Sequence, residues 1–161
     1  MSTLYTTHDS PLGELLLVSD GAALVSVSVP EQRGGATVLP GWERGDTCPV
    51  LVEAGRQLDA YFGGGLKSFA LQLAPSGTEF RRRVWAALDD VPYGATTSYG
   101  ELAARVGASR AAVRAVGGAV GANPLLIVRP CHRVIGADGS LTGYAGGLAR
   151  KRHLLTLEGS L

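Results

Sequence analysis

Two short helical segments separated by a tight turn lie in the second half of the sequence, at 98–107 and 110–121. The first begins with the capping box Ser98-x-x-Glu101, whose side chains can satisfy backbone N–H groups of the first helical turn, and it ends at Gly107. Such a pair predicts a helix-turn-helix, with 110–121 in the place of the recognition helix. The same geometry occurs in proteins that do not touch DNA, so it leaves nucleic-acid binding open.

The second of these helices is built almost entirely of small residues. They are Ala111, Ala112, Ala115, Gly117, Gly118, Ala119 and Gly121. A glycine weakens a helix by about 1 kcal/mol relative to alanine, and close approach of another surface is the usual reason for keeping it. Such a smooth helix could lie in a DNA groove and push Arg114 into the base stack. Tight packing against another helix, with Arg114 in solvent, explains the composition equally well.

The first half of the chain predicts a small α/β unit. Residues 13–30 contain two strands joined at Ser19-Asp20-Gly21, in which Val25, Val27 and Val29 alternate with serines as one buried face requires. The segment PVLVEAGRQLDAYFGGG is spaced like a helix that the glycines stop.

The segment APSGT, 74–78, is the candidate domain boundary, and we expect domains at 1–76 and 77–161. The balance of charge changes there, because residues 1–78 carry four basic and eight acidic side chains whereas 79–161 carry eleven basic and six acidic ones. A polyanion would meet the second half, although ordinary scatter of surface charge is an alternative.

Three further elements are expected in the second half. Thr78 can cap a helix that Pro92 ends, and 125–128 is an apolar run typical of a short buried strand. Because Pro130 cannot continue a central strand, Cys131 is expected where the chain leaves the sheet. A last helix, ending at Glu158 and Gly159, is expected to offer three leucines to the core: Leu148, Leu155 and Leu157.

Nothing in the sequence predicts export or membrane insertion. No run approaches the length that crosses a bilayer, and MSTLYTTHDS lacks the basic flank and apolar stretch of a signal peptide, so we expect a cytoplasmic protein. Cys48 and Cys131 lie far apart and form no C-x-x-C, which argues against a zinc finger or a disulfide framework.

Cys131 and His132 form the candidate reactive centre. The phosphatase pattern C-x5-R fails at Ala137, and the deaminase and papain-type patterns are also absent. A thiol with the ordinary pKa of about 8.5 is only about 3% thiolate at neutral pH, so a nucleophile needs a base. Adjacent side chains of an extended chain diverge, so His132 would take the proton through a bridging water, and Glu158 is our candidate for orienting the imidazole. A buried structural thiol is the simpler alternative, which the flanking His132 and Arg133 disfavour.

The motifs RAVGGAVGANP, PCHRVIG and GSLTGYAGG, the last followed by a lysine and LLTLEG, resemble the methylated-DNA:protein-cysteine methyltransferases, or O6-alkylguanine-DNA alkyltransferases. The resemblance covers 78–159, and the first half is similar only in plan. It implies an α+β fold, in which a small ribonuclease-H-like α/β domain precedes a mostly helical, winged-helix-like domain. It also implies repair of duplex DNA by one irreversible transfer of an alkyl group from guanine O6, with thymine O4 a further candidate, after base flipping and without a cofactor.

The resemblance further implies roles for individual residues. Cys131 accepts the alkyl group, His132 and Glu158 complete a water-linked relay, Asn123 braces the turn that carries the cysteine, and Tyr144 steadies the leaving O6. Arg114 fills the gap left by the flipped base, and Tyr99 presses on the target phosphate. The expected DNA contacts are Arg114, Tyr99, Arg110, Ala115, Gly117, Gly118 and Arg133. The expected pocket consists of Val134, Gly143, Ala145, Gly146, Gly147 and Lys151.

Arg129 departs from the family pattern, which usually has an aliphatic residue there. If the chain is extended, Arg129 shares a face with Cys131 and could favour the thiolate; alternatively it bends to solvent or phosphate. There is also one more residue between Tyr99 and Arg114 than in the commonest spacing. Cys48 with His8 cannot supply four ligands, so we expect no metal.

The expected partner is double-stranded DNA containing alkylated guanine, and we expect a monomer, with cooperative loading on DNA left open. An alkyltransferase-like protein, which binds alkylated DNA without transfer, is the alternative function, and the intact Cys131–His132 pair disfavours it. An unrelated cysteine hydrolase would leave Arg114 and the glycine-rich helix unexplained.

Overall fold

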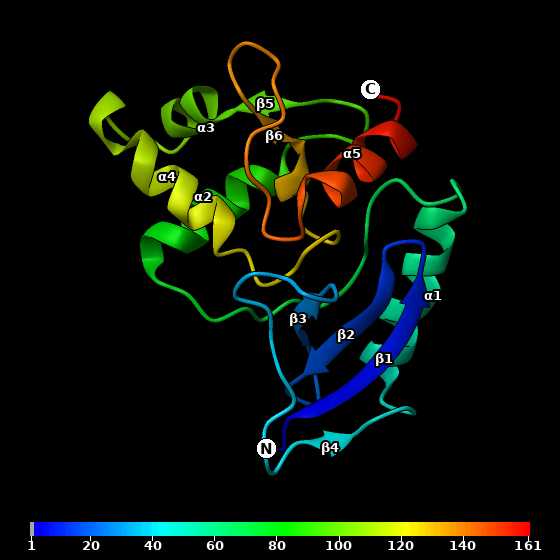
Figure 1. Ribbon diagram of the computed structural model, residues 1–161. Helices are drawn as coiled ribbons and strands as arrows, with labels where there is room; N and C mark the ends of the chain where they lie inside the picture. Colours follow the sequence, from blue (N-terminus) through cyan, green and yellow to red (C-terminus); the bar gives the residue numbers. More distant parts are fainter. Residues whose placement is uncertain (1) are drawn as a thin grey trace. The chain divides into compact units, whose positions relative to one another are not determined.

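The computed structural model describes residues 2–161, and these divide into two compact units between Ser76 and Gly77. The first unit consists of a sheet and one helix, and the second is mostly helical (Figure 1). The expected α+β class is therefore confirmed. Within the described part of the chain, no helix is both long and apolar enough to cross a membrane.

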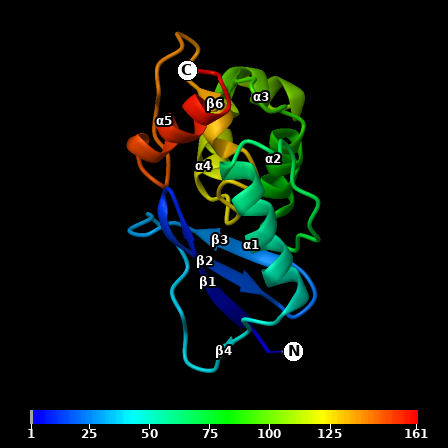
Figure 2. The ribbon, with the colours of Figure 1, turned by 90° about the vertical axis from the view of Figure 1, so that its right-hand side faces the viewer.

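The first unit is a four-stranded sheet with a helix packed against it. Its strands are β1 (Leu4–Ser10), β2 (Gly13–Ser19), β3 (Leu24–Ser28) and β4 (Glu43–Arg44), in the sheet order β3-β2-β1-β4. The first three strands pair antiparallel, and β4 pairs parallel with β1. Helix α1 (Pro49–Phe62) packs against β1, β2 and β3, and Figure 2 shows it across one face of the sheet.

The hairpin and the helix predicted in this unit are confirmed, but β1 was not predicted. Its sequence LYTTHDS lacks a strict apolar alternation, yet it pairs with β2 from Leu4 opposite Ser19 to Ser10 opposite Gly13. Pairing with a strongly apolar neighbour makes it a strand. Ser28, predicted on the exposed face of the hairpin, is buried because the following loop covers it, and its hydroxyl accepts a hydrogen bond from the Ala36 N–H at 3.2 Å.

The second unit contains four helices and one short parallel pair of strands among the described residues. The helices are α2 (Glu79–Asp89), α3 (Tyr99–Arg105), α4 (Val113–Gly121) and α5 (Leu148–Leu157); the strands are β5 (Thr97–Ser98) and β6 (Val134–Ile135). Helices α2, α3 and α4 pack together. Between α2 and α4, the buried Trp85 donates its indole N–H to the Ala119 carbonyl at 2.8 Å.

The two helix starts predicted from capping residues agree with the structure, whereas the helix predicted from 110 begins as a 3-10 segment and becomes α-helical at Val113. The Thr78 hydroxyl accepts a hydrogen bond from the Arg81 N–H at 3.2 Å, and the Ser98 hydroxyl accepts one from the Glu101 N–H at 3.1 Å. These caps fix where α2 and α3 begin. A turn and the 3-10 segment Arg110–Ala112 connect α3 to α4, so the predicted pair of helices is present.

The predicted strand at 125–128 is wrong. Residues 125–127 are buried as expected and Val128 is half-buried, but the run closes on itself. Arg129 N–H donates to the Leu125 carbonyl at 2.9 Å, and Val128 N–H donates to the Leu126 carbonyl at 2.8 Å. The turns satisfy these backbone groups locally, so the run needs no neighbouring strand. In α5, Leu154 and Leu155 are buried, whereas Leu148, predicted to reach the core, is exposed.

Candidate active site

Cys131 begins a 3-10 turn, Cys131–Arg133, directly after Pro130. Its N–H donates to the Arg129 carbonyl at 2.8 Å, and Pro130 between them has φ −82° and ψ 55°, the geometry of an inverse γ-turn. The chain here is therefore folded rather than extended. The expectation that Cys131 and His132 diverge because they lie on an extended segment was based on the wrong local geometry.

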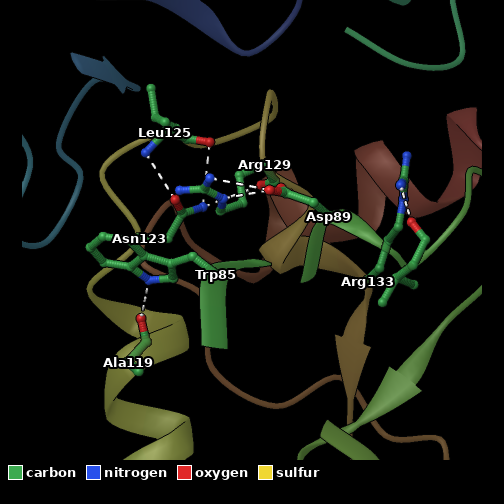
Figure 3. A network of polar contacts seen from close by, with 8 residues as sticks. Trp85, Asp89, Ala119, Asn123, Leu125, Arg129 and Arg133 are labelled. Atoms are coloured by element: carbon green, nitrogen blue, oxygen red, sulfur yellow. Dashed lines mark hydrogen bonds and ion pairs between the residues drawn. The ribbon is translucent and has the colours of Figure 1, made fainter. Parts of the chain in front are cut away.

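Asn123 holds this turn from the end of α4. Its amide nitrogen donates to the carbonyl of Arg129 at 3.2 Å and to that of Leu125 at 3.4 Å, and its amide oxygen accepts from the Leu125 N–H at 3.0 Å (Figure 3). Asn123 is buried, and these bonds use both ends of its amide. The side chain thus ties the two ends of the 125–129 turn together beside the cysteine.

The Cys131 thiol is buried and protonated at neutral pH. Burial raises the pKa of Cys131 to about 11, and hydrogen bonding from Asn123, the charge of Lys151 and hydrogen bonding with Tyr144 only partly oppose this. All three groups lower the pKa of the thiol, so they would stabilise a thiolate as it forms. The resting thiol therefore needs a proton acceptor before it can react.

His132 is the candidate acceptor, and it is fully buried. Its Nε2 lies 2.8 Å from Glu158 Oε2. Burial lowers the pKa of His132, against the opposing influence of Glu158, so the ring is neutral at pH 7. A carboxylate only accepts hydrogen bonds, so Nε2 carries the proton and Nδ1 keeps its lone pair. Nδ1 has no hydrogen-bond partner within residues 2–161 and is the atom able to accept a proton.

Arg133 corrects one prediction. It was predicted to contact DNA, but it is buried: Nε donates to Glu158 Oε1 at 2.7 Å, Nη2 donates to Oε2 at 3.0 Å, and Nη1 donates to the Val91 carbonyl at 2.6 Å. These bonds leave its guanidinium occupied inside the protein. The sequence contained one indication of this burial. Arg133 directly precedes the apolar pair Val134 and Ile135, and a charged residue that is buried beside such a pair needs a partner of opposite charge.

Lys151 anchors the loop that precedes α5. Its buried ammonium group donates to the carbonyls of Val134 at 2.6 Å, Thr142 at 2.9 Å and Gly143 at 3.4 Å. The other residues expected in a pocket, Ala145, Gly146 and Gly147, follow in this loop, which closes with a bond from Gly147 N–H to the Tyr144 carbonyl at 2.9 Å. Lys151 therefore holds β6 and the loop together.

Helix α4 and the 3-10 segment before it expose four of the seven residues predicted to touch DNA. Arg110 of the 3-10 segment and Arg114, Ala115 and Gly118 of α4 are exposed. Apart from chain neighbours and the helix's own backbone, no atom lies within 4 Å of the position that a Gly118 Cβ would occupy. Internal packing therefore does not require this glycine. Helix packing, one of the two explanations that the sequence left open, therefore does not account for Gly118, and the approach of DNA stays a prediction.

Tyr99, the first residue of α3, lies beside α4 and the loop before α5. The position of a Gly117 Cβ is 3.8 Å from its ring, and its hydroxyl accepts a hydrogen bond from the Thr142 hydroxyl at 3.4 Å. Tyr99 therefore connects the smooth helix to the loop that Lys151 holds.

Arg129 reaches neither solvent nor the cysteine. Its buried guanidinium forms an ion pair with Asp89 at the end of α2, which differs from both orientations considered from the sequence. Both cysteines are free and buried, and residues 2–161 contain no group of three or more His, Cys, Asp or Glu side chains able to hold a metal ion.

Comparisons with known proteins agree along nearly the whole chain. Residues 3–75 match the family description "6-O-methylguanine DNA methyltransferase, ribonuclease-like domain", and residues 79–160 match "6-O-methylguanine DNA methyltransferase, DNA binding domain". A methylated-DNA–protein-cysteine methyltransferase of Methanosarcina acetivorans is 49% identical over 97% of this chain and 98% of its own length. One of Mycobacterium leprae is 51% identical, covering 93% of this chain and 88% of its own. A crystal structure of Mycobacterium tuberculosis OGT in complex with DNA matches with a TM-score of 0.88 and 48% identity, covering 98% of this chain and 93% of that one.

Proposed function

The chain belongs to the 6-O-methylguanine DNA methyltransferase family, and we propose that it repairs alkylated DNA by moving the alkyl group from guanine O6 to its own Cys131. The observation that carries this proposal is the buried Cys131 thiol, followed in the chain by a buried histidine whose Nδ1 has no hydrogen-bond partner among the described residues. The family membership and this geometry point to the same reaction. Cys131, His132, Glu158, Asn123 and Tyr144 are its proposed catalytic and supporting residues.

The reaction begins with loss of the thiol proton. His132 accepts it on Nδ1 through a bridging water, and Glu158, hydrogen-bonded to Nε2, stabilises the imidazolium. Glu158 keeps its place because Arg133 binds both of its oxygens. The role of Arg133 is thus to hold the relay, not to bind DNA.

The sulfur then attacks the saturated alkyl carbon. A C–S bond forms, the C–O6 bond breaks, and its electron pair stays with the guanine, which finally takes up the proton that the thiol lost. The Tyr144 side chain, which lowers the pKa of the Cys131 thiol, steadies the developing charge on O6 in this proposal. The product is a thioether without a carbonyl for water to attack, so each molecule reacts once and no cofactor takes part.

The base must leave the duplex before its O6 can reach a buried sulfur. The exposed small residues of α4 allow close contact with the DNA, Arg114 fills the gap in the base stack, and Tyr99 presses on the phosphate. Arg110, Ala115, Gly117 and Gly118 complete this surface. The flipped base enters between Val134 and the loop at 143–147 that Lys151 anchors.

Residues 77–161 are the proposed DNA-binding and alkyl-acceptor domain, and 1–76 supports it. Alkylated guanine in duplex DNA is the substrate, with thymine O4 a second candidate atom, and the protein acts as a monomer. We place this activity in the cytoplasm, as expected from the sequence. The alternative of binding without transfer is not supported, because Cys131 is present and the curated relatives are named methyltransferases.

The test is the mass of the intact protein after incubation with a duplex that contains O6-methylguanine. The wild type should gain one methyl group per chain, on the peptide that contains Cys131, and should not turn over again. Cys131→Ser should gain nothing, whereas Cys48→Ser should behave as the wild type. A wild-type protein that binds the duplex but gains no mass would overturn the proposal and support binding without transfer.

A further inference from the structure

Arg129, two residues before Cys131, is buried and paired with a carboxylate, although it takes no part in the relay. Its Nε donates to Asp89 Oδ1 at 3.1 Å and its Nη2 donates to Oδ2 at 3.2 Å, while its guanidinium carbon lies 5.6 Å from the centre of the Trp85 ring. Its side chain is only 8% exposed. Figure 3 shows this side chain between Asp89, Trp85 and the turn that Asn123 braces. A guanidinium with a bidentate carboxylate partner has a defined position.

The backbone of Arg129 belongs to a strained segment that leads to the nucleophile. Ile127 has φ 73°, in the left-handed region that a β-branched residue rarely adopts, and the Val128 N–H to Leu126 carbonyl bond closes a tight turn around it. Such a conformation is strained and persists only where its surroundings fix it. A second tight turn follows at once, in which the Arg129 carbonyl accepts from the Cys131 N–H. The position of the sulfur therefore depends on what anchors Arg129.

We propose that Arg129 is a positioning residue for alkyl transfer, which ties the turn bearing Cys131 to the end of α2 through Asp89 and Trp85. Asn123 holds the same turn through the Arg129 carbonyl, so the backbone and the side chain of one residue are anchored on different elements. This inference rests on the proposed transfer to Cys131. It gives a role to Arg129, the residue at which this segment departs from the usual family pattern.

The electrostatic alternative, in which Arg129 stabilises the thiolate directly, is weaker. Asp89 neutralises the guanidinium, and the charge that opposes the raised pKa of the Cys131 thiol is that of Lys151. Asp89 also gains from the pair, because a carboxylate at the C-terminal end of a helix is unfavourable unless a cation compensates it.

The neighbouring pair Arg105–Asp90 is a matched control. Asp90 follows Asp89 at the end of α2, and its oxygen lies 3.1 Å from Arg105 Nη2, but the two side chains are 67% and 46% exposed. The Arg105 guanidinium is on α3 and does not belong to the turn that carries Cys131. Both pairs can be broken by the same substitutions.

The experiment measures single-turnover methyl transfer at saturating DNA, at a temperature where every variant is folded. Arg129→Met and Asp89→Asn should each slow transfer by about tenfold, since displacing a reacting atom by about 1 Å can cost about 100-fold. The double variant should be no slower than Arg129→Met alone, and Arg129→Lys should recover part of the rate. DNA affinity and the midpoint of the pH–rate profile should not change. Arg105→Met and Asp90→Asn should transfer at the wild-type rate.

Two outcomes would overturn the inference. The first is a wild-type transfer rate in both Arg129→Met and Asp89→Asn. The second is slow transfer together with a higher midpoint of the pH–rate profile, which would mean that Arg129 stabilises the thiolate electrostatically. A merely structural role would lower the midpoint of thermal unfolding and leave the rate of the folded protein unchanged. Labelling of Cys131 by iodoacetamide, resolved from Cys48 by peptide mapping, needs no DNA and should become faster in Arg129→Met. If the wild type transfers nothing, the proposed function fails, and this labelling still tests the positioning.

Discussion

A histidine meets a carboxylate in both units, and the two pairs have almost the same geometry. His8 Nε2 lies 2.7 Å from Asp59 Oδ1 in the first unit, and His132 Nε2 lies 2.8 Å from Glu158 Oε2 in the second. Their surroundings differ: the side chains of His8 and Asp59 are 24% and 68% exposed, whereas those of the second pair are both 0% exposed. A hydrogen-bond distance therefore does not distinguish an exposed pair on the surface from the proposed relay.

The two pairs differ in their burial and in the presence of a third partner, Arg133, in the second pair. Water screens the His8–Asp59 pair, so we expect it to contribute little to the free energy of unfolding. In the second, Glu158 holds both His132 and Arg133 inside the protein, where an unpaired charge is very costly. The comparison predicts that equal substitutions in the two pairs have very unequal effects.

The largest effect is expected for Glu158→Gln. The amide leaves the buried Arg133 without a counter-charge, so the free energy of unfolding should fall by about 3–5 kcal/mol, and the remaining folded protein should transfer poorly. Urea unfolding followed by circular dichroism measures the first effect, and methyl transfer measures the second. A loss below about 1 kcal/mol would show that burial does not separate the two pairs.

The next largest effect concerns the rate. Removing the proton acceptor in His132→Gln should slow methyl transfer by about 100-fold to 10,000-fold, the usual contribution of a positioned acid or base. DNA affinity should stay as in the wild type, because His132 is buried. His8→Gln is the matched variant and should transfer normally. Equal rates in His132→Gln and the wild type would remove His132 from the mechanism.

The pH dependence of stability sharpens the comparison further. Burial lowers the pKa of His132 below its ordinary value of 6.5, so the unfolded chain binds this proton more readily than the folded one. The contribution of His132 to the free energy of unfolding is therefore complete above pH 6.5. It is lost as the pH falls from 6.5 through the pKa that His132 has in the folded protein. This acid-side loss should persist in His8→Gln.

The pKa of Cys131 is shifted in the opposite direction, so it affects stability on the alkaline side. Burial raises this pKa from 9.0 to about 11. The contribution of the Cys131 thiol to the free energy of unfolding is therefore complete below pH 9.0 and is lost as the pH rises through about 11. Urea titrations between pH 5 and 11 should show both losses, and Cys131→Ser should remove the alkaline one. An alkaline loss that survives in Cys131→Ser would have to come from another group.

The smallest effect is expected in the first unit. A double-mutant cycle of His8→Gln and Asp59→Asn should give a coupling free energy below about 1 kcal/mol, and moderate salt should reduce it further. Both single variants should transfer methyl groups at the wild-type rate. A coupling above about 2 kcal/mol would mean that the exposed pair is less screened than its surroundings indicate.

The elements that local patterns specify were predicted correctly. Thr78 and Ser98 begin the helices that they cap, and the hairpin turns at Ser19-Asp20-Gly21. The structure brings Asn123 and Tyr144 to Cys131, and Glu158 to His132, as the motifs led us to expect. Their roles in transfer stay predictions until the proposed experiments test them.

The partners of charged residues could not be predicted, because they come from distant parts of the chain. Arg133 was expected on DNA, but Glu158, 25 residues away, binds it. Arg129 pairs with Asp89, which is 40 residues away. Burial of both guanidiniums excludes the outward orientations that sequence spacing allows, and each takes the carboxylate that the packing brings near it.

The sequence by itself determined the class of fold, the helix starts, the pair Cys131–His132 and the family, because caps, turns and motifs act over a few residues. The tertiary structure alone decided that 125–128 is a turn, that the exposed face of α4 has glycines with no internal contact, and that Arg129 and Arg133 are buried. The physical reason is that desolvation depends on all the elements packed around a group. A thiol with a pKa near 11 and a neutral histidine beside it result from that packing, and no spacing of residues encodes them.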